Sequence, residues 1–203
     1  MEIDADGLSI RDTYALMTGI VVPRPIAWVS TMDDKGHVNL APFSYFNAVG
    51  SDPPMLTLSI AARGDGSDKD TLRLIKTTGF LCVNLAEEGD AVRLNDTSAE
   101  LPAEVSEARH FGIDTAPCFK IPGVRIASSR AALECRLVEV HVYGRKHKVN
   151  LVVAEVLHLF VDDALLQRGV PGLHINPAAV QPIARLGGAN YAALGRRFSL
   201  HRP

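Results

Sequence analysis

The chain has 203 residues, of which 47% are hydrophobic and 22% charged, and its formal net charge is −2. These values are typical of an ordinary globular protein near the upper size for one hydrophobic core, and we therefore expect a single domain over residues 1–203. The small negative charge excludes the general case for a partner that is a nucleic acid or an anionic membrane.

The charge is unevenly distributed. After Asp163 the chain has no acidic residue and five arginines, so the first 163 residues carry −7 and the remainder +5. The part after about residue 192 is a basic C-terminal tail, too dilute in charge for a nucleic-acid arm. We expect these arginines to dock on the acidic body of the chain or on a second subunit.

Cysteine usage and the N-terminus indicate a cytoplasmic location. Cys82, Cys118 and Cys135 are odd in number and widely spaced, which favours neither a disulfide framework nor a zinc site. The first ten residues are acidic where a signal peptide would be basic. The longest apolar stretch, 151–161, is interrupted by charge and too short to cross a bilayer. We expect a soluble protein with reduced cysteines and no membrane partner.

The first half of the chain shows strand patterns. A strand over 26–31 is followed by the turn sequence Asp-Asp-Lys-Gly at 33–36. Residues 37–47 are expected to run back as an irregular extended segment, because Pro42 has no N–H for a central ladder. A second strand covers 55–61, where polar and apolar residues alternate.

A helix follows, which Ser67, Asp68 or Asp70 can cap and which ends at Gly79. Further strands are expected over 80–85, 132–143 and 150–161, with short helices and turns between 87 and 123 and a basic turn over 144–148. In the strand from residue 132, Cys135 and its apolar neighbours alternate with Glu134 and Arg136, which predicts one buried and one more solvent-exposed face. The pattern favours a small antiparallel barrel with peripheral helices.

The sequence lacks the motifs of several enzyme classes. Gly64-x-Gly66 has no third glycine at dinucleotide-binding spacing, and no Walker loop, G-x-S-x-G or H-E-x-x-H occurs. No two histidines lie four residues apart, so no metal site is expected. His141 and His158 are interpreted as packing or hydrogen-bonding residues of the two long strands.

One loop has the composition of an anion site. Residues 63–71 run into the predicted helix, whose N-terminus offers unpaired N–H groups and partial positive charge. Arg63 and Lys69 add charge, and Ser67 and Thr71 add hydroxyl donors. The alternative is a solvated polar loop with a capping aspartate, and the acids of the loop oppose an anion.

Two further segments are open to two interpretations. Ser30-Thr31, at a strand end, can bond a ligand or only the local backbone. The segment 41–47, Ala-Pro-Phe-Ser-Tyr-Phe-Asn, can line a pocket for a flat heterocycle or belong to the core with satisfied polar groups.

Taken together, these stretches resemble the flavin reductase-like family of FMN-binding split barrels. The resemblance is carried by residues 22–31, 39–47, 52–54, 69–71, 80–84, Glu134-Cys135 and the R-L-G-G-x-x-Y run at 185–191, in family order and spacing. It covers roughly residues 12–192.

The resemblance implies a homodimer of six-stranded antiparallel split β-barrels with one FMN per subunit near the dimer interface. The phosphate role is carried onto Ser30, Thr31, Arg63, Lys69 and Thr71. The ring role is carried onto Ala41, Pro42, Phe43, Ser44 and Asn47. No catalytic side chain and no metal is implied.

The function implied is that of an NAD(P)H-dependent flavin reductase, in which hydride passes from nicotinamide to FMN without a side-chain acid or base. Such a protein can supply reduced flavin to a monooxygenase. The alternative is a flavoredoxin-like electron carrier that exchanges electrons with a protein partner and does not use NAD(P)H. A cofactor-free interaction barrel is a third hypothesis, which the intact Ser30-Thr31 and Lys69-Asp70-Thr71 oppose.

Overall fold

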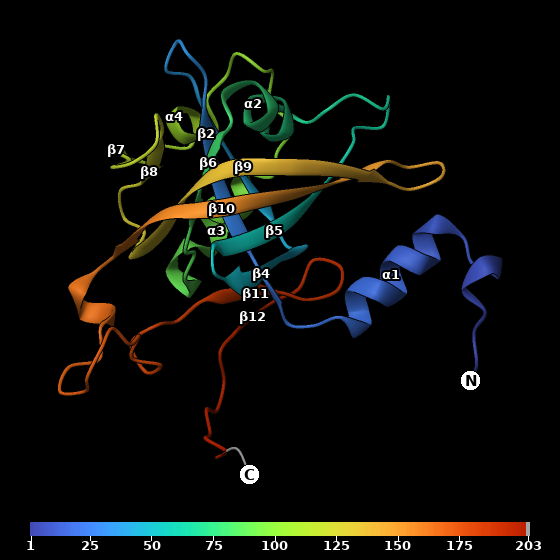
Figure 1. Cartoon of the computed structure of the whole chain (residues 1–203). Helices are drawn as coiled ribbons and strands as arrows, with labels where there is room; N and C mark the ends of the chain where they lie inside the picture. Colours follow the sequence, from blue (N-terminus) through green and yellow to red (C-terminus); the bar gives the residue numbers. More distant parts are fainter. Residues whose placement is uncertain (202–203) are drawn as a thin grey trace.

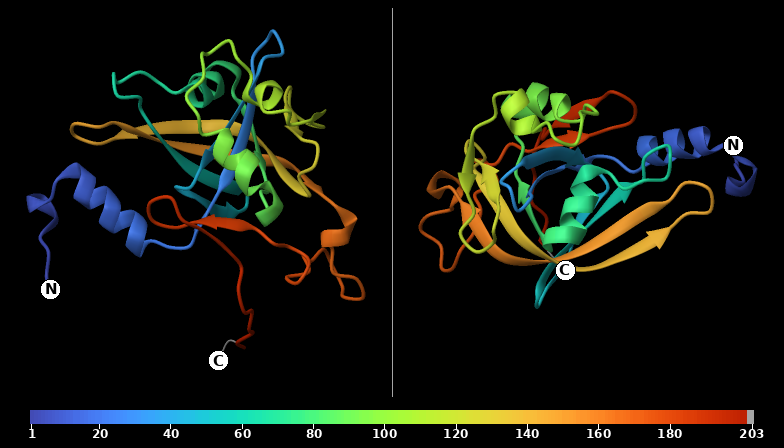
Figure 2. Two further views of the ribbon diagram at one scale, coloured as in Figure 1. Left: turned by 180° about the vertical axis from the view of Figure 1, so that it is seen from behind. Right: turned by 90° about the horizontal axis from the view of Figure 1, so that it is seen from above.

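A computed structural model describes residues 1–201 of the chain, and its main element is a curved antiparallel sheet that wraps into a split barrel (Figures 1 and 2). The strand order in this sheet is β3-β2-β6-β9-β10-β5-β4. The strands are β2 (Ala27–Met32), β3 (Val38–Phe43), β4 (Phe46–Ser51), β5 (Pro54–Ala61), β6 (Phe80–Asn84), β9 (Ala131–Tyr143) and β10 (Val149–Val161). The predicted split-barrel class is confirmed, with seven strands in this sheet rather than six.

The strand β3 corrects the prediction of an irregular segment after residue 37. It pairs regularly with β2 from Val38 to Phe43, with Pro42 opposite Trp28. Because β3 is an edge strand, its even-numbered residues turn their backbone nitrogens to the free edge, where Leu40 N meets the Glu107 carboxylate. Pro42 therefore costs no ladder hydrogen bond.

The helix α2 (Asp70–Thr78) packs on the barrel, and its predicted cap is wrong. Lys69 is the N-cap residue and makes no side-chain cap bond. Ser67 instead bonds Asp65, and the Asp68 carboxylate lies 2.7 Å from Lys76 Nζ. The predicted end is confirmed, because Gly79 adopts the left-handed conformation with φ 79°. The N-terminus of α2 is thus left without a side-chain cap.

The barrel interior holds one hydrophobic cluster, to which α2 contributes Leu72 and Ile75 and the sheet contributes Val29, Leu58 and Cys135. A second cluster, around Trp28, Leu40 and Leu94, covers the outer face of β2. The elements around this second cluster include α3 (Ala91–Asp96), α4 (Glu107–His110), β8 (Val124–Ile126) with its partner β7 (Thr115–Pro117), and the small sheet of β1 (Arg24–Pro25), β11 (Ile183–Arg185) and β12 (Tyr191–Ala193). Strand β2 is therefore buried on both faces.

Glu134, on β9, was predicted on a solvent-exposed face and is instead 1% exposed. Its carboxylate accepts hydrogen bonds from Phe119 N at 2.8 Å and Lys120 N at 2.6 Å, and lies 3.1 Å from His158 Nδ1. The loop between β7 and β8 folds over this face, which alternation within the strand does not reveal. The hydrogen-bonding role predicted for His158 is confirmed.

The N-terminal helix α1 (Ile10–Ile20) was not predicted. It begins after Ser9, whose side chain accepts from Asp12 N at 3.1 Å. Only Thr18 is buried in it, and the helix stands away from the barrel beside the projecting β9–β10 hairpin (Figures 1 and 2). Short 3₁₀ turns, η1 (Ala5–Gly7), η2 (Glu88–Asp90) and η3 (Asp163–Leu165), complete the described elements.

The C-terminal arginines do not pair with acidic groups in residues 1–201. Arg197 donates to Val180 O at 2.9 Å and to the Gln181 side chain at 3.1 Å, and Arg196 lies over the Phe198 ring. Arg202 lies outside the described residues. Docking of these arginines on the acidic body is therefore not seen. None of the described helices has the length and apolar character needed to cross a membrane.

Candidate functional site

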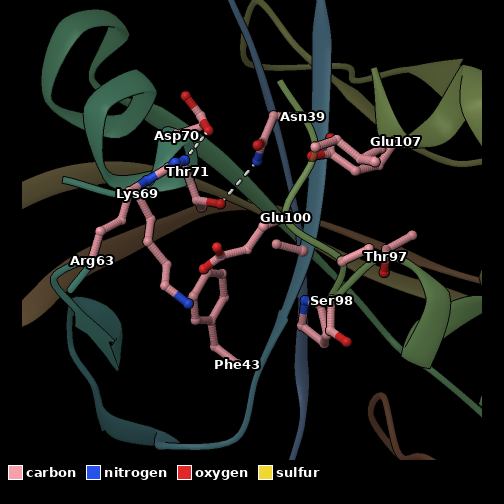
Figure 3. Close-up of a pocket in the computed structure, with 14 residues that line it drawn as sticks. Asn39, Phe43, Arg63, Lys69, Asp70, Thr71, Thr97, Ser98, Glu100 and Glu107 are labelled. Atoms are coloured by element: carbon pink, nitrogen blue, oxygen red, sulfur yellow. Dashed lines mark hydrogen bonds and ion pairs between the residues drawn. The ribbon is translucent and has the colours of Figure 1, made fainter. Parts of the chain in front are cut away.

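A pocket opens between the edge strand β3, the start of α2 and the segment 97–101 that follows α3 (Figure 3). Strand β3 turns Asn39, Ala41 and Phe43 to it, since alternate residues of a strand share a face. Pro42 also lines it. The pocket therefore has an apolar wall on β3 and a polar end at α2.

The polar end is organised by Asn39. Its Nδ2 donates to Thr71 Oγ1 at 2.8 Å (Figure 3). The same nitrogen lies 3.3 Å from Thr31 Oγ1. Because the Thr71 oxygen accepts this bond, its own O–H proton is free to donate into the pocket. The predicted residues Thr31 and Thr71 are thus brought together, with Asn39 between them.

Lys69 supplies the cation of the pocket. Its side chain extends into the cavity in Figure 3, and it forms no ion pair within residues 1–201. Arg63 also lines the pocket, but its guanidinium bonds the Asp70 carboxylate, which Arg73 contacts as well at 3.0 Å. The guanidinium of Arg63 is therefore held by a carboxylate that it shares with Arg73, whereas the ammonium of Lys69 is available to a ligand.

A buried acid, Glu107, forms part of the opposite wall and was missed by the sequence analysis. It is 8% exposed, and its Oε2 accepts from Leu40 N at 3.0 Å. Burial raises the pKa of this carboxyl, and the hydrogen bond from Leu40 only partly opposes the shift. Glu107 thus supplies a hydrogen-bond acceptor for the free edge of β3.

Ser30 lies outside this pocket. Its Oγ donates to Val124 O at 2.6 Å and accepts from Asn84 Nδ2 at 3.1 Å. Ser30 and Thr31 are neighbours on β2 and point to opposite faces, so only one of the pair can face the ligand side. The side chain of Ser30 belongs to a buried polar network that joins β2, β6 and β8.

The residues expected around the ring lie in three places. Ala41, Pro42 and Phe43 line the pocket. Ser44 lies in an adjoining groove, where its Oγ accepts from Arg24 Nε at 3.3 Å. Asn47 lies on β4, its side chain bonds Ala48 N at 2.9 Å, and it lines neither cavity.

The segment 97–101 gave no signal in the sequence. Thr97 is buried, accepts from Trp28 Nε1 at 3.0 Å and donates to Leu94 O at 2.9 Å. These bonds hold the segment against the core so that Ser98 and Glu100 lie at the rim of the pocket. The contact joins residues 69 positions apart, which local patterns do not encode.

The donor set fits a phosphate monoester attached to a flat, apolar group. One unpaired ammonium, one free hydroxyl proton and the first N–H groups of an uncapped helix converge at one end, and the wall of β3 extends from them. The family comparison agrees with this fit. The sequence model of the flavin reductase like domain matches residues 17–180. The chain belongs to the flavin reductase-like family. An uncharacterized protein BH2278 of Halalkalibacterium halodurans is 35% identical over all of this chain and 97% of that protein.

Solved structures agree with this assignment. Component B of nitrilotriacetate monooxygenase from Bacillus cereus superposes with a TM-score of 0.92 at 30% identity, over 98% of each chain. The 2-nitrobenzoate 2-nitroreductase NbaA of Pseudomonas fluorescens superposes with a TM-score of 0.89 at 30% identity, over 100% of this chain and 96% of that chain. This flavin reductase-like chain therefore superposes over nearly its whole length on proteins whose names describe redox reactions.

Proposed function

We propose that this protein binds FMN in the pocket of β3 and α2 and acts as an NAD(P)H-dependent flavin reductase. The observation that carries the proposal is the unpaired Lys69 beside Thr71, at the uncapped start of α2, next to the apolar wall of Ala41, Pro42 and Phe43.

Each residue has a defined part in this proposal. Lys69 and Thr71 hold the phosphate, and the first N–H groups of α2 add partial positive charge. Asn39 is a positioning residue that fixes the Thr71 hydroxyl and connects it to Thr31. Arg63 contributes through its ion pair with Asp70, which holds the loop before α2 in place.

Ser30 and Asn47, by contrast, are given structural roles, because their side chains are engaged elsewhere. Ala41, Pro42 and Phe43 provide the apolar surface for the ring. Bound flavin supplies the hydride chemistry, so the chain needs no general acid or base of its own. The protein contributes binding, orientation and a site shielded on one side from water.

The similarity to a monooxygenase component B supports a role in which reduced flavin is passed to a monooxygenase. A second candidate is direct reduction of an aromatic nitro compound, which the similarity to the 2-nitrobenzoate nitroreductase favours. The electron carrier that ignores NAD(P)H remains the alternative to both.

The decisive experiment is the visible spectrum of protein loaded with FMN, recorded without oxygen before and after addition of NADH and then NADPH. Bleaching of the flavin bands supports the reductase. Flavin bands that persist with both nucleotides, yet bleach with a reduced redox protein, select the carrier. Failure to bind FMN refutes the proposal.

The residue assignment has its own test. We predict that Lys69→Ala weakens FMN binding by about 1.5–3 kcal/mol, the usual value of a hydrogen bond to a charged group, which is about 10- to 150-fold in Kd. The control is Lys76→Ala on the same helix, whose ammonium pairs with Asp68 away from the pocket. If Lys69→Ala leaves the Kd unchanged and lowers only the thermal stability, the phosphate site is misplaced.

The proposal includes a homodimer. Helix α1 exposes Ile10, Tyr14, Met17 and Ile20, which its own barrel leaves uncovered. The neighbouring β9–β10 hairpin exposes further apolar side chains, Val138, Val142 and Tyr143. Surfaces of this kind in one region favour contact with a second copy. A molar mass near one chain in light scattering would contradict the dimer.

A cytoplasmic location is also part of the proposal. All three cysteines are free, and Cys82 and Cys135 are buried, which suits a reducing compartment. Secretion of the protein in its native host would contradict this.

A further inference from the structure

A second groove adjoins the proposed flavin pocket at Pro42 of β3. The two cavities share Pro42 and Ser98 in their linings. The second groove has apolar walls from Ile26, Pro42 and Leu94, and a polar end at Arg185. A ligand in the second groove would therefore lie next to a group bound against Pro42 in the first pocket.

Arg185 is the one charged side chain among the residues that line this groove. Its guanidinium lies over the Tyr191 ring, 4.4 Å from the ring centroid, and donates one hydrogen bond to Gly188 O. It forms no ion pair within residues 1–201. Stacking and one backbone bond therefore orient the guanidinium and leave its other N–H donors for a ligand.

The neighbouring arginine cannot take this part. Arg24 is 5% exposed, and its terminal nitrogens donate to Thr18 O at 2.7 Å, Val21 O at 3.0 Å and Leu186 O at 3.0 Å. These carbonyls occupy its donors and tie α1 to the β11–β12 turn. The groove thus offers one available positive charge.

The polar end is completed by Asn95 and Tyr191. The Tyr191 hydroxyl lies 3.1 Å from Asn95 Oδ1, which fixes the ring under the guanidinium. Asn95 lines the same groove, and its Nδ2 makes no hydrogen bond within the described residues. A guanidinium with an amide donor beside it matches the two oxygens of a carboxylate.

We propose that this groove is a binding subsite for a planar aromatic molecule with a single carboxylate, in which Arg185 holds the carboxylate and Ile26, Pro42 and Leu94 hold the ring. A phosphate ester fits less well, because one guanidinium without a second cation leaves part of a double negative charge uncompensated. That this ligand is a redox substrate rests on the proposed function, whereas its binding does not.

The test uses benzoate as the probe and benzamide as its neutral counterpart, with calorimetric titration of the full chain in the presence and absence of FMN. We expect benzoate to bind at least tenfold more tightly than benzamide. Arg185→Gln should weaken benzoate binding at least tenfold and leave benzamide binding unchanged. The matched control is Arg196→Gln, whose side chain lies over Phe198 outside the groove, and it should bind benzoate as the wild type does.

Three results would overturn the subsite. These are equal affinities for benzoate and benzamide, benzoate binding unaltered by Arg185→Gln, and competition between benzoate and FMN for one site. Arg185→Lys is a further control for a folding defect in Arg185→Gln, because it changes the same residue but keeps the positive charge. It should bind benzoate with an affinity between those of the wild type and Arg185→Gln. Benzoate binding that depends on Arg185 in a protein that does not bind FMN would uphold the subsite and refute the proposed reductase.

Discussion

The buried carboxylate of Glu134 offers a sharp test of how the loop between β7 and β8 is held. Its two oxygens accept hydrogen bonds from Phe119 N and Lys120 N and contact His158 Nδ1. In Glu134→Gln one oxygen becomes an NH₂ group, which cannot accept, so at least one of these donors loses its partner. The loss of one hydrogen bond to a charged group costs about 1.5–3 kcal/mol.

For a chain of this size we expect Tm to fall by about 3–12 °C at pH 7, since 1 kcal/mol corresponds to about 2–4 °C. Burial alone would raise the pKa of Glu134, but the hydrogen bonds from Phe119, Lys120 and His158 hold it below its ordinary value of 4.5. Such a group stabilises the fold above its unfolded pKa, and this contribution is lost as the pH falls through the folded pKa.

The assay is urea unfolding followed by circular dichroism, at pH 7 and at steps below pH 4.5. The difference between wild type and Glu134→Gln should be largest at pH 7 and shrink as the pH falls. Glu155→Gln on the adjacent strand is the control, because its partner Arg136 is 56% exposed and solvent screens the pair, so the substitution should cost less than about 1 kcal/mol. Equal stability of Glu134→Gln and wild type at pH 7, or a difference independent of pH, would refute the reasoning.

Three further substitutions have defined outcomes. Ser30→Ala should lower the unfolding free energy by about 1–3 kcal/mol, because it removes the hydroxyl donor to Val124 O and one of the acceptors of Asn84 Nδ2. It should leave the Kd for FMN unchanged in a flavin fluorescence titration. Glu107→Gln keeps an acceptor for Leu40 N and replaces a buried carboxyl group whose pKa is raised. The stability of this variant relative to wild type should therefore increase as the pH rises through the pKa of Glu107. A gain in stability seen only at acid pH would contradict this. Gly79→Ala should lower the unfolding free energy in urea by about 1–2 kcal/mol, because its φ of 79° is unfavourable for alanine. An added Cβ would contact nothing within 4 Å, so the backbone conformation alone sets this cost. An unchanged unfolding free energy would show that the turn relaxes.

Local patterns in the sequence predicted those features that depend on near neighbours. The alternation at 55–61 and in the two long strands, and the helix end at Gly79, are set by residues that follow one another. The proximity of Lys69 and Thr71 was predictable for the same reason, because Lys69 is the N-cap residue of α2 and Thr71 lies in its first turn.

The errors arise where distant segments meet. Glu134 follows the alternation of an exposed face, but a loop fifteen residues earlier in the chain covers it and supplies its donors. Thr97 is held at the pocket by a hydrogen bond from Trp28, a residue of the second core cluster that lies far away in the sequence. Helix α1 is an exception, because its Ser9 cap and the helical spacing of Ile10, Tyr14 and Met17 are local signals that the sequence analysis did not use.

One error was avoidable from the sequence itself. Ser30 and Thr31 were assigned one role, although the two-residue period of a strand places consecutive side chains on opposite faces. Applied to β2, that rule separates Thr31, which lies with Asn39 and Thr71, from Ser30, which lies with Asn84.

The bond between Trp28 and Thr97 gives the protein an internal optical reporter. Trp28 is its single tryptophan, is 1% exposed, and bonds through Nε1 to a residue of the pocket wall. Its emission therefore comes from one environment, directly behind the segment that a ligand would contact. An absorbing ligand such as a flavin would quench that emission by energy transfer, whereas a colourless ligand would alter it only by moving Thr97. Occupancy of the pocket and displacement of its wall can thus be followed separately in the unlabelled chain.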